Sequence, residues 1–368
     1  MFFALTYILI RGCIDLMNGS VNKITLSVTI IILVQCVNYV VSPFSNDFIL
    51  GMAQTFIHIK AFLVLYLFSQ FSESFTKRKV SLIFFFSFTV VSIGLVLNLI
   101  FGPPWHLLIG VVAKYRDGMI RPISIFENTA NLGYFYALTS SVIYLTSNKF
   151  NLNGLSRYSV LFIKVIIDFI LMHVITVRKL IIGVFPVIFI VFRKERVDNK
   201  FFLMISICAF VLVVLLLMRD SYIYEETLLN LSRFNTDDHY YIRGLMFYYG
   251  MNLFVEYFPF GTGGGTFGTI VSTINTLDVY SHVGLSLGWL VNESGKYVGI
   301  FDNGFGAYIG ENGFIGVVSL IYFIFVMYSR LKRKNKDIAY FVMAFTVLTS
   351  FIGPAWQDGV YTAILSII

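Results

Sequence analysis

The fold of this chain is decided by stretches such as Val80–Phe101, VSLIFFFSFTVVSIGLVLNLIF, in which no residue is charged. A helix of roughly 20 apolar residues is long enough to cross the hydrocarbon of a bilayer. The basic tripeptide Lys77–Lys79 precedes the stretch, and the turn-forming residues Gly102 and Pro103 follow it. Charges and helix breakers of this kind are expected where a helix leaves the bilayer. The stretch therefore predicts a transmembrane helix.

Stretches of the same kind recur along the whole chain. Of its 368 residues, 57% are hydrophobic and only 13% are charged, which is more apolar than a water-soluble domain of this size requires. We therefore predict an all-α polytopic membrane protein in which residues 1–368 form a single transmembrane domain of about ten helices. The predicted spans are 2–16, which is short, 23–42, 47–69, 80–101, 128–147, 157–176, 180–192, 200–218, 303–329 and 338–353.

Basic residues give these spans an orientation, because cytoplasmic connections carry an excess of Lys and Arg. The basic clusters are Lys77, Arg78 and Lys79; Arg193, Lys194, Arg196 and Lys200; and Arg330, Lys332, Arg333, Lys334 and Lys336. Alternation from these clusters makes 102–127 the first external loop and 219–302 a large external loop, which carries more Asp and Glu than Lys and Arg. The net charge of +7 follows from this topology and does not form the basic face that binds nucleic acid.

The large external loop contains an aromatic segment followed by a glycine-rich one. Tyr240–Phe258 is too polar for a span and predicts a helix in the membrane interface, whose aromatic rings either anchor the loop or stack on sugars. The run Gly261–Gly268, GTGGGTFG, lacks the following Lys-Ser/Thr and the preceding strand of a nucleotide-binding loop, so we expect it to supply tight turns where the loop docks against helices. We expect Asp237, Asp238 and His239 to be solvated and to hold no metal.

Several ionisable residues fall within predicted spans, where an unpaired charge is costly. Lys164 and Asp168 are four residues apart, so we expect them to pair on one helix face, as we expect for Arg11 and Asp15. The residues with no partner nearby in the sequence are His58, Lys60 and His173. For these three, a structural role and a functional role stay equally open.

Arginines on the external side break the positive-inside pattern and therefore need another reason to be there. A guanidinium binds phosphate oxygens through two parallel hydrogen bonds and stays charged at any relevant pH, so a lipid pyrophosphate is a natural ligand. The alternative is that each arginine reaches lipid headgroups or pairs with a carboxylate of the loop. The external arginines are Arg116, Arg121, Arg178, Arg219, Arg233 and Arg243.

A candidate general base stands where the large loop returns to the membrane. Asp302 precedes an apolar helix. A carboxylate at this position either caps the first turn or, half-buried beside a lipid-linked substrate, accepts a proton. His282 and Glu293 of the same loop are alternatives for the role of base.

Four segments, in order, resemble motifs of the O-antigen polymerase (Wzy) and O-antigen ligase superfamily, bacterial membrane glycosyltransferases of the GT-C type. The first, from Arg121, is RPISIFENTANLGYFYAL and is similar to a pattern of arginine, small loop, asparagine and helix. The second, TVRKLIIGVFPVIFIV around Arg178, resembles a Thr-x-Ser-Arg turn with Val177 in place of Ser. The third, RGLMFYYGMNLFVEYFPFGTGGGTFG from Arg243, resembles a stretch from an arginine to Pro-x-Gly-x-Gly. The fourth, DNGFGAYIGENGFIGVVSLIYFIF from Asp302, resembles a motif ending in Glu-x-Gly-x-x-Gly.

The resemblance implies an inverting glycosyl transfer, without metal or cofactor, at the outer face of the bacterial inner membrane. A terminal sugar hydroxyl of one lipid-linked unit attacks the anomeric carbon of a glycan on undecaprenyl pyrophosphate, which leaves. The implied catalytic residues are Asp302, Arg178 and Arg243. The residues expected to bind substrate are Arg116, Arg121, Arg233, His282 and Glu293. Expected partners are undecaprenyl-pyrophosphate-linked glycans, membrane lipids, a chain-length regulator and a flippase.

The leading prediction is a polymerase of repeat units for O-antigen, capsule or a related exopolysaccharide. Ligases of the superfamily, which pass glycan to a lipid A core, carry a histidine at the position that Asp302 matches, and this difference favours a polymerase. A lipid-linked oligosaccharide flippase belongs to a different class and would explain the ionisable residues within spans. Transporters usually have repeated halves and lack a loop of this length, so the flippase ranks lower.

Overall fold

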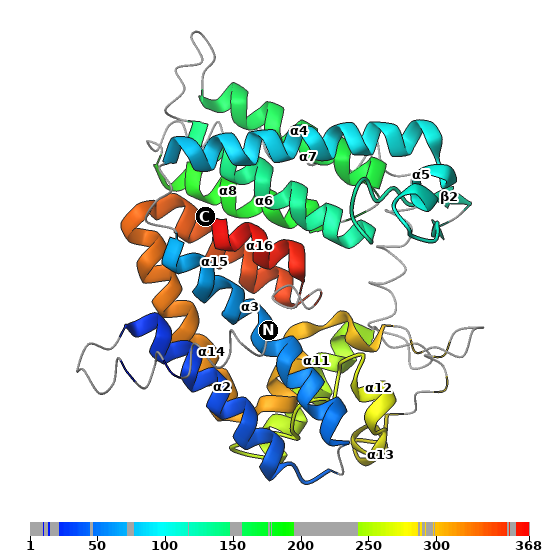
Figure 1. The fold of residues 1–368 in the computed structure, drawn as a ribbon, viewed down its shortest axis with the longest axis vertical. Helices are drawn as coiled ribbons and strands as arrows, with labels where there is room; N and C mark the ends of the chain where they lie inside the picture. Colours follow the sequence, from blue (N-terminus) through cyan, green and yellow to red (C-terminus); the bar gives the residue numbers. More distant parts are fainter. Residues whose placement is uncertain are drawn as a thin grey trace. The chain divides into compact units, whose positions relative to one another are not determined.

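The structure of the chain is a computed structural model, and it is predominantly helical (Figure 1). It describes residues 10, 14, 22–44, 47–71, 77–116, 118–147, 157–175, 177, 179–194, 242–285, 288, 291, 297, 299–351, 353 and 358–367. Nearly all of the predicted span 2–16, all of the predicted span 200–218 and residues 219–241 of the large loop lie outside these ranges.

Most of the predicted spans coincide with a described helix. These helices are α2 (Lys23–Val41), α3 (Phe48–Phe71), α4 (Lys77–Phe101), α6 (Thr129–Ser147), α7 (Arg157–Ile175), α8 (Lys179–Lys194), α14 (Gly304–Lys334) and α15 (Lys336–Ser350). Among the described residues, three helices are long and apolar enough to cross a membrane: α2, Lys79–Phe101 of α4 and Gly304–Arg333 of α14.

The remaining elements are short and belong mainly to the predicted external loops. Strands β1 and β2 pair antiparallel, with Tyr115 opposite Ile120. The short elements are α5 (Pro103–Leu108), β1 (Tyr115–Arg116), β2 (Met119–Ile120), α11 (Ile242–Glu256), α12 (Ser272–Asn275), α13 (Asp278–His282), the 3-10 turn η3 (Ile300–Asp302) and α16 (Gly359–Ile367).

The chain divides into two compact units. Unit 1 comprises Met1–Phe71, Arg233–Lys334 and Thr346–Ser366, and unit 2 comprises Ser72–Ser232, Asn335–Phe345 and Ile367–Ile368. In unit 2, α6 is the central helix, because α4, α7 and α8 all pack against it. Its side chains Tyr136 and Leu138 are fully buried, and Gly183 of α8 lets the backbones of α6 and α8 approach closely at Ala137.

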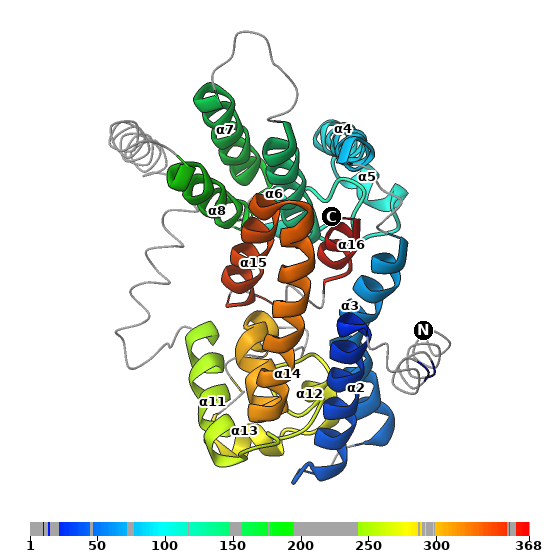
Figure 2. The ribbon, with the colours of Figure 1, turned by 90° about the vertical axis from the view of Figure 1, so that its left-hand side faces the viewer.

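Unit 1 is built around α14, against which α2 and α11 pack (Figure 2). One buried apolar cluster joins α2, α3 and α14 and consists of Ile24, Val28, Ile31, Ile32, Ile59, Leu63, Tyr308, Leu320, Phe323 and Val326. A second cluster joins α11 to the loop that follows it and consists of Met246, Leu253, Phe267, Val279, Tyr280, Leu285 and Ile300. The glycine-rich stretch of the loop, residues 261–268, is buried throughout and contributes Phe267 to the second cluster, so it is part of the interior of unit 1.

Helix α14, which corresponds to the predicted span 303–329, is interrupted at Gly313. Gly313 has φ 58° and ψ −159°, outside the helical region, and it separates a short first segment from the long remainder of α14. Figures 1 and 2 show that α14 changes direction partway along its length. A Cβ on Gly313 would overlap the backbone of Pro259, Phe260 and Gly261, so the glycine-rich loop crosses α14 at this break. The prediction of a helix here is confirmed, and the structure adds a break at Gly313 that the apolar pattern did not indicate.

Helix α11 and the first segment of α14 run parallel. Their backbones meet at Gly250 and Gly306, where a Cβ on either glycine would overlap the backbone of the other helix. Further along, Gly310 lies against Leu253. Because the two helices pack in parallel, their N-terminal ends lie at the same end of unit 1. Arg243 is in the first turn of α11, and Asp302 comes just before α14.

Candidate functional site

The glycine-rich loop, Gly261–Gly268, owes its path to glycines that adopt a left-handed backbone. Gly261, Gly263, Gly265 and Gly268 have φ values of 77°, 94°, 78° and 69°. Residues with a Cβ rarely adopt such angles, so the run of glycines lets the chain turn repeatedly within a few residues. The expectation that this loop supplies tight turns where it docks against helices is confirmed by its contacts in unit 1.

The loop replaces hydrogen bonds that α14 loses at its break. The N–H groups of Thr262 and Gly263 donate to the carbonyls of Gly310 and Glu311, at 3.0 and 2.9 Å. On the other side of the break, the N–H of Ile315 donates to the carbonyl of Pro259 at 3.2 Å. Buried backbone groups need such partners, because an unpaired one costs as much as a lost hydrogen bond. The loop and the broken helix therefore satisfy one another.

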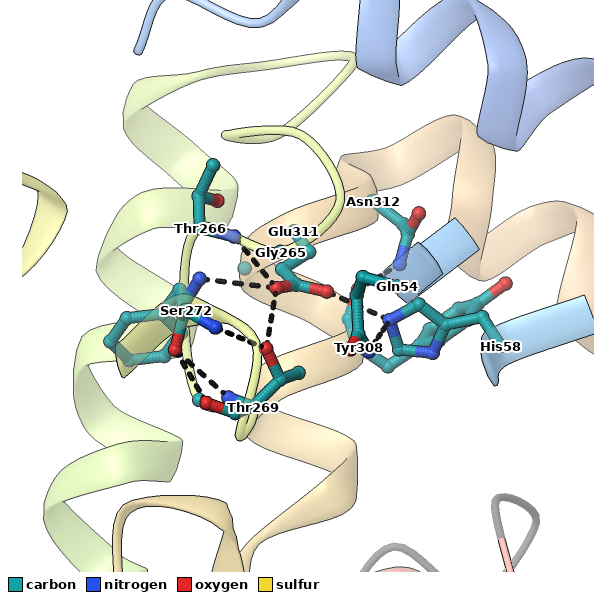
Figure 3. Close-up of polar contacts among 12 residues, drawn as sticks. Gln54, His58, Gly265, Thr266, Thr269, Ser272, Tyr308, Glu311 and Asn312 are labelled. Carbon is teal, nitrogen blue, oxygen red and sulfur yellow. Dashed lines mark hydrogen bonds and ion pairs between the residues drawn. The ribbon is translucent and has the colours of Figure 1, made fainter. Parts of the chain in front are cut away.

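Glu311 extends from the broken helix into the loop and meets a set of hydrogen-bond donors (Figure 3). Its Oε1 atom accepts hydrogen bonds from the backbone N–H groups of Thr266 and Phe267, at 3.0 and 3.1 Å. The Thr269 hydroxyl donates to the same oxygen at 3.4 Å. Consecutive backbone N–H groups of this kind favour a negative charge. The loop thus forms an anion-binding turn, and the carboxylate of Glu311 occupies it.

The second carboxylate oxygen of Glu311 faces α3. Its Oε2 atom lies 2.7 Å from Nε2 of His58, and both side chains are completely buried. Gln54, one turn earlier in α3, places its amide nitrogen 2.9 Å from the same His58 nitrogen. The ring of Tyr308 meets the imidazole edge to face, with 5.5 Å between centroids. We call Gln54, His58, Thr266, Phe267, Thr269 and Glu311 the Glu311 network.

The arrangement of the Glu311 network argues against a phosphate-binding site and favours a structural link between helices. The loop amides that would bind a phosphate already hold the Glu311 carboxylate, which agrees with the sequence argument against a nucleotide site. Among the residues that the structure describes, no group of three His, Cys, Asp or Glu side chains could hold a metal ion. With Glu311 and His58 both enclosed, the network links α3, the loop and α14 and does not offer an open surface to a substrate.

The predicted catalytic residues Arg243 and Asp302 lie close together. The side-chain amide of Asn303, which directly follows Asp302, donates to the carbonyl of Arg243 at 2.8 Å. The Asn303 carbonyl oxygen accepts from the N–H of Gly306 at 2.8 Å and so caps α14. Arg243 is partly buried, and Asp302 ends the turn η3. Asn303 thus supplies a cap for α14 of the kind that the sequence assigned as one alternative to Asp302.

His282 lies at the other end of α11 from Arg243. Its Nε2 atom is 2.7 Å from a carboxylate oxygen of Glu256 and 3.1 Å from the hydroxyl of Tyr257. The side chains of His282 and Glu256 are 41% and 49% exposed. Burial and the Glu256 carboxylate together raise the pKa of Tyr257. From Arg243 to Glu256 the helix rises by about 20 Å. His282 therefore does not share a site with Arg243 and Asp302, and its predicted binding of substrate stays a prediction.

Of the other predicted site residues, two lie in unit 2 and three lie outside the described residues. Arg116 is in β1, and Arg121 follows β2, where it is partly buried and its N–H donates to the carbonyl of Lys114 at 2.9 Å. The residues outside the described ranges are Arg178, Arg233 and Glu293. Arg11 and Asp15, as well as Asp237, Asp238 and His239, also lie outside them.

The ionisable residues of the predicted spans have divided outcomes. The predicted pairing of Lys164 with Asp168 is confirmed, since the amine and the carboxylate form a buried ion pair to which Ser140 adds a 3.0 Å hydrogen bond. His58 has a partner that local sequence could not indicate, and His173 is exposed.

Glu311 is a candidate functional residue that sequence reasoning passed over, although a signal was present. It is the only charged residue between Asp302 and Arg330, in the middle of an otherwise apolar helix. An isolated carboxylate within an apolar span marks a functional site by default.

Comparison of the chain with models of known protein families gives no match. Comparison with curated proteins likewise gives no significant match. A functional assignment therefore rests on the residues and on their arrangement.

Proposed function

We propose that the chain is a multi-pass enzyme of the bacterial inner membrane that polymerises oligosaccharide repeat units carried on undecaprenyl pyrophosphate. The observation that carries the proposal is the meeting of two sequence segments that resemble motifs of one superfamily. The segment that begins at Arg243 and the segment that begins at Asp302 join through the hydrogen bond from Asn303 to Arg243. The glycine-rich end of the first segment likewise docks on the Glu-x-Gly-x-x-Gly end of the second.

The proposed chemistry needs a cation and a base in the same place. The acceptor hydroxyl forms a bond to the anomeric carbon, the bond from that carbon to the pyrophosphate oxygen breaks, and the hydroxyl proton passes to a carboxylate. Arg243 would stabilise the charge that develops on the leaving pyrophosphate, and Asp302 would take the proton. The parallel packing of α11 and α14 supports this assignment, because the positive ends of both helix dipoles lie on the same side as Arg243.

The membrane setting of the proposal comes from the helices and from the distribution of charge. Three described helices are long and apolar enough to cross a bilayer, and about ten spans are proposed for the whole chain. The basic ends of α8 and α14 would face the cytoplasm by the positive-inside rule. With the predicted span 200–218 following α8, that orientation puts the large loop 219–302 on the outer side, where lipid-linked repeat units are joined.

The test complements a strain that lacks the gene with one version of the gene at a time and separates its surface glycan on a gel. The wild-type chain should restore a ladder of long glycans, whereas Arg243→Ala should leave a single repeat unit attached to its acceptor. Lys114→Ala removes an exposed basic side chain of the first predicted external loop and should restore the ladder. A full ladder from Arg243→Ala at normal abundance of the protein would contradict the proposal.

A transporter of lipid-linked oligosaccharide is a second candidate, and one observation favours it. The buried His58–Glu311 contact joins two helices within the predicted spans, and buried ionisable residues of this kind often carry protons in transporters. Purified protein in detergent distinguishes the two functions. A polymerase elongates lipid-linked glycans without a sealed membrane, whereas a transporter leaves their length unchanged.

A further inference from the structure

The Glu311 network lies where four elements of unit 1 meet. Glu311 belongs to α14, His58 belongs to α3, and the donors to the carboxylate belong to the glycine-rich loop. Asn38 of α2 donates to the carbonyl of the neighbouring Asn312 at 3.0 Å. A displacement of Glu311 and its neighbour Asn312 would therefore disturb contacts with α2, α3 and the loop.

A buried pair of this kind is better suited to specify an arrangement than to add stability. Removing two ionisable groups from water is costly, and replacement of such a pair by apolar residues is often neutral or stabilising. His58 and Glu311 are 253 residues apart and both are fully buried. Their contact is satisfied in one relative position of α3 and α14, so it selects that position among alternatives.

The loop held by Glu311 in turn packs against α11. Gly268 lies against Ala307 and the terminal methyl of Met246. A Cβ on Gly268 would come within 2.6 Å of the Ala307 Cβ, so only glycine fits there. The N–H of Gly268 donates to the hydroxyl of Tyr280 at 2.8 Å, and burial keeps the pKa of Tyr280 well above its usual range, so that hydroxyl stays neutral. The loop thereby fixes how α11 lies against the first segment of α14.

The starts of α11 and α14 carry the proposed catalytic residues. Asn303 joins them through its hydrogen bond to the carbonyl of Arg243. Glu311 is eight residues beyond Asn303, which corresponds to about 12 Å along a helix. Glu311 is therefore too distant and too enclosed to touch a substrate held by Arg243 and can act only through the helices between them.

We propose that the His58–Glu311 pair is a positioning device, which fixes the glycine-rich loop and thereby holds Arg243 and the Asp302–Asn303 turn in one arrangement. This inference rests on the proposed polymerase function. It assigns a role to the only described charged residue in the apolar part of α14. It also assigns a role to His58, for which the sequence offered no partner.

The test uses the purified full-length protein and a lipid-linked repeat unit, with the variants Glu311→Gln and His58→Gln. Both keep the size and polarity of the side chain but remove the carboxylate–imidazole contact. Each should lower kcat per folded molecule by about 10- to 100-fold and leave KM nearly unchanged, because a small misplacement of catalytic groups is costly. The double variant should be no worse than either single variant, since both remove the same contact.

The matched control is Asp168→Asn, which removes the charge of another buried carboxylate that pairs with a cation. It should leave kcat per folded molecule unchanged, even if it lowers the melting temperature. If Glu311→Gln and His58→Gln behave in the same way as Asp168→Asn, the pair is structural only and the inference is wrong. If the wild-type protein makes no polymer, the proposed function fails instead of the inference about the pair. In a preparation that does make polymer, Arg243→Ala tests the proposed function separately from the pair.

A milder variant covers the case in which Glu311→Gln and His58→Gln do not fold. Gln54→Met removes the amide that touches His58 and leaves every bond of Glu311 in place. It should lower kcat by about 2- to 5-fold with KM unchanged, in keeping with a looser positioning of the imidazole. An unchanged kcat in folded Gln54→Met would overturn the inference.

Discussion

The Lys164–Asp168 pair of α7 and the His58–Glu311 pair of unit 1 are both buried, but they are constructed differently. Lys164 and Asp168 lie four residues apart on one helix, and the Asp168 carboxylate also accepts a hydrogen bond from the hydroxyl of Ser140. His58 and Glu311 are 253 residues apart, and Glu311 also accepts hydrogen bonds from two backbone N–H groups.

The difference shows what each carboxylate holds in place. Loss of Asp168 would leave one amine, whose long apolar stem can carry it toward a polar surrounding. Loss of Glu311 would leave the N–H groups of Thr266 and Phe267 buried in a loop that cannot move them separately. The first pair therefore neutralises a helix face, whereas the second organises a loop and a broken helix.

The largest effect is expected from Gly313→Ala, which breaks the contact between the loop and α14 on which the Glu311 network depends. A Cβ there would meet backbone atoms of Pro259, Phe260 and Gly261, and the residue has φ 58°. We expect a loss of more than about 4 kcal/mol, enough to prevent accumulation of folded protein. The measurement is the amount of monodisperse protein after extraction and size-exclusion chromatography.

The control for this variant is Gly284→Ala, since Gly284 has φ 73° and no atom lies near its missing Cβ. This variant should lose only the energy of holding alanine in a left-handed backbone, about 1 kcal/mol, and should yield folded protein. Equal yields from the two variants would show that the close approach of loop and helix does not matter.

The next largest effect is expected from Glu311→Ala, whose loss of stability is compared with that of Asp168→Ala to test the two pairs directly. Removing one member of a buried pair costs about 3–5 kcal/mol when the partner is left without compensation. We expect Glu311→Ala to reach that range and Asp168→Ala to lose about 1–2 kcal/mol, because Lys164 can reorient. Thermal unfolding followed in detergent measures both, and a larger loss for Asp168→Ala would reverse the interpretation.

A sharper comparison replaces both members of each pair by apolar residues. Lys164→Met with Asp168→Leu should change stability by less than about 1 kcal/mol, because such replacements are often neutral. His58→Leu with Glu311→Leu should still lose about 2 kcal/mol or more, because the loop N–H groups no longer have an acceptor. The same unfolding measurement applies, and full recovery of the His58–Glu311 double variant would show that the loop does not depend on the carboxylate.

The smallest effects concern single hydroxyl donors. Ser140→Ala removes the 3.0 Å bond to Asp168. Thr269→Val removes the 3.4 Å bond to Glu311 and also the hydroxyl oxygen that accepts from the buried N–H of Ser272 at 3.1 Å. Ser140→Ala should cost about 1 kcal/mol or less, and Thr269→Val about 1–2 kcal/mol, because it leaves a buried N–H without that acceptor. Thermal unfolding measures both variants, and a larger drop in melting temperature for Ser140→Ala would contradict this order.

The sequence by itself determined the helices and the local pair. The bounds of α2, α4 and α6 follow the lengths of apolar stretches, and such lengths are local properties of the chain. The pairing of Lys164 with Asp168 is local too, because a spacing of four residues places both on one helix face. The glycine run predicted a loop docked against helices, since only glycine adopts so many left-handed angles at little cost.

Only the tertiary structure decided the break of α14 and the identity of the Glu311 network. Glycine at 313 permits a positive φ but does not require it, and the break forms because the loop crosses there and supplies the missing hydrogen bonds. The network joins His58 directly to Glu311 across 253 residues, and it binds the other carboxylate oxygen through backbone N–H groups, which every residue except proline carries alike. No residue type marks which of those N–H groups will face a carboxylate, because that depends on where distant segments pack.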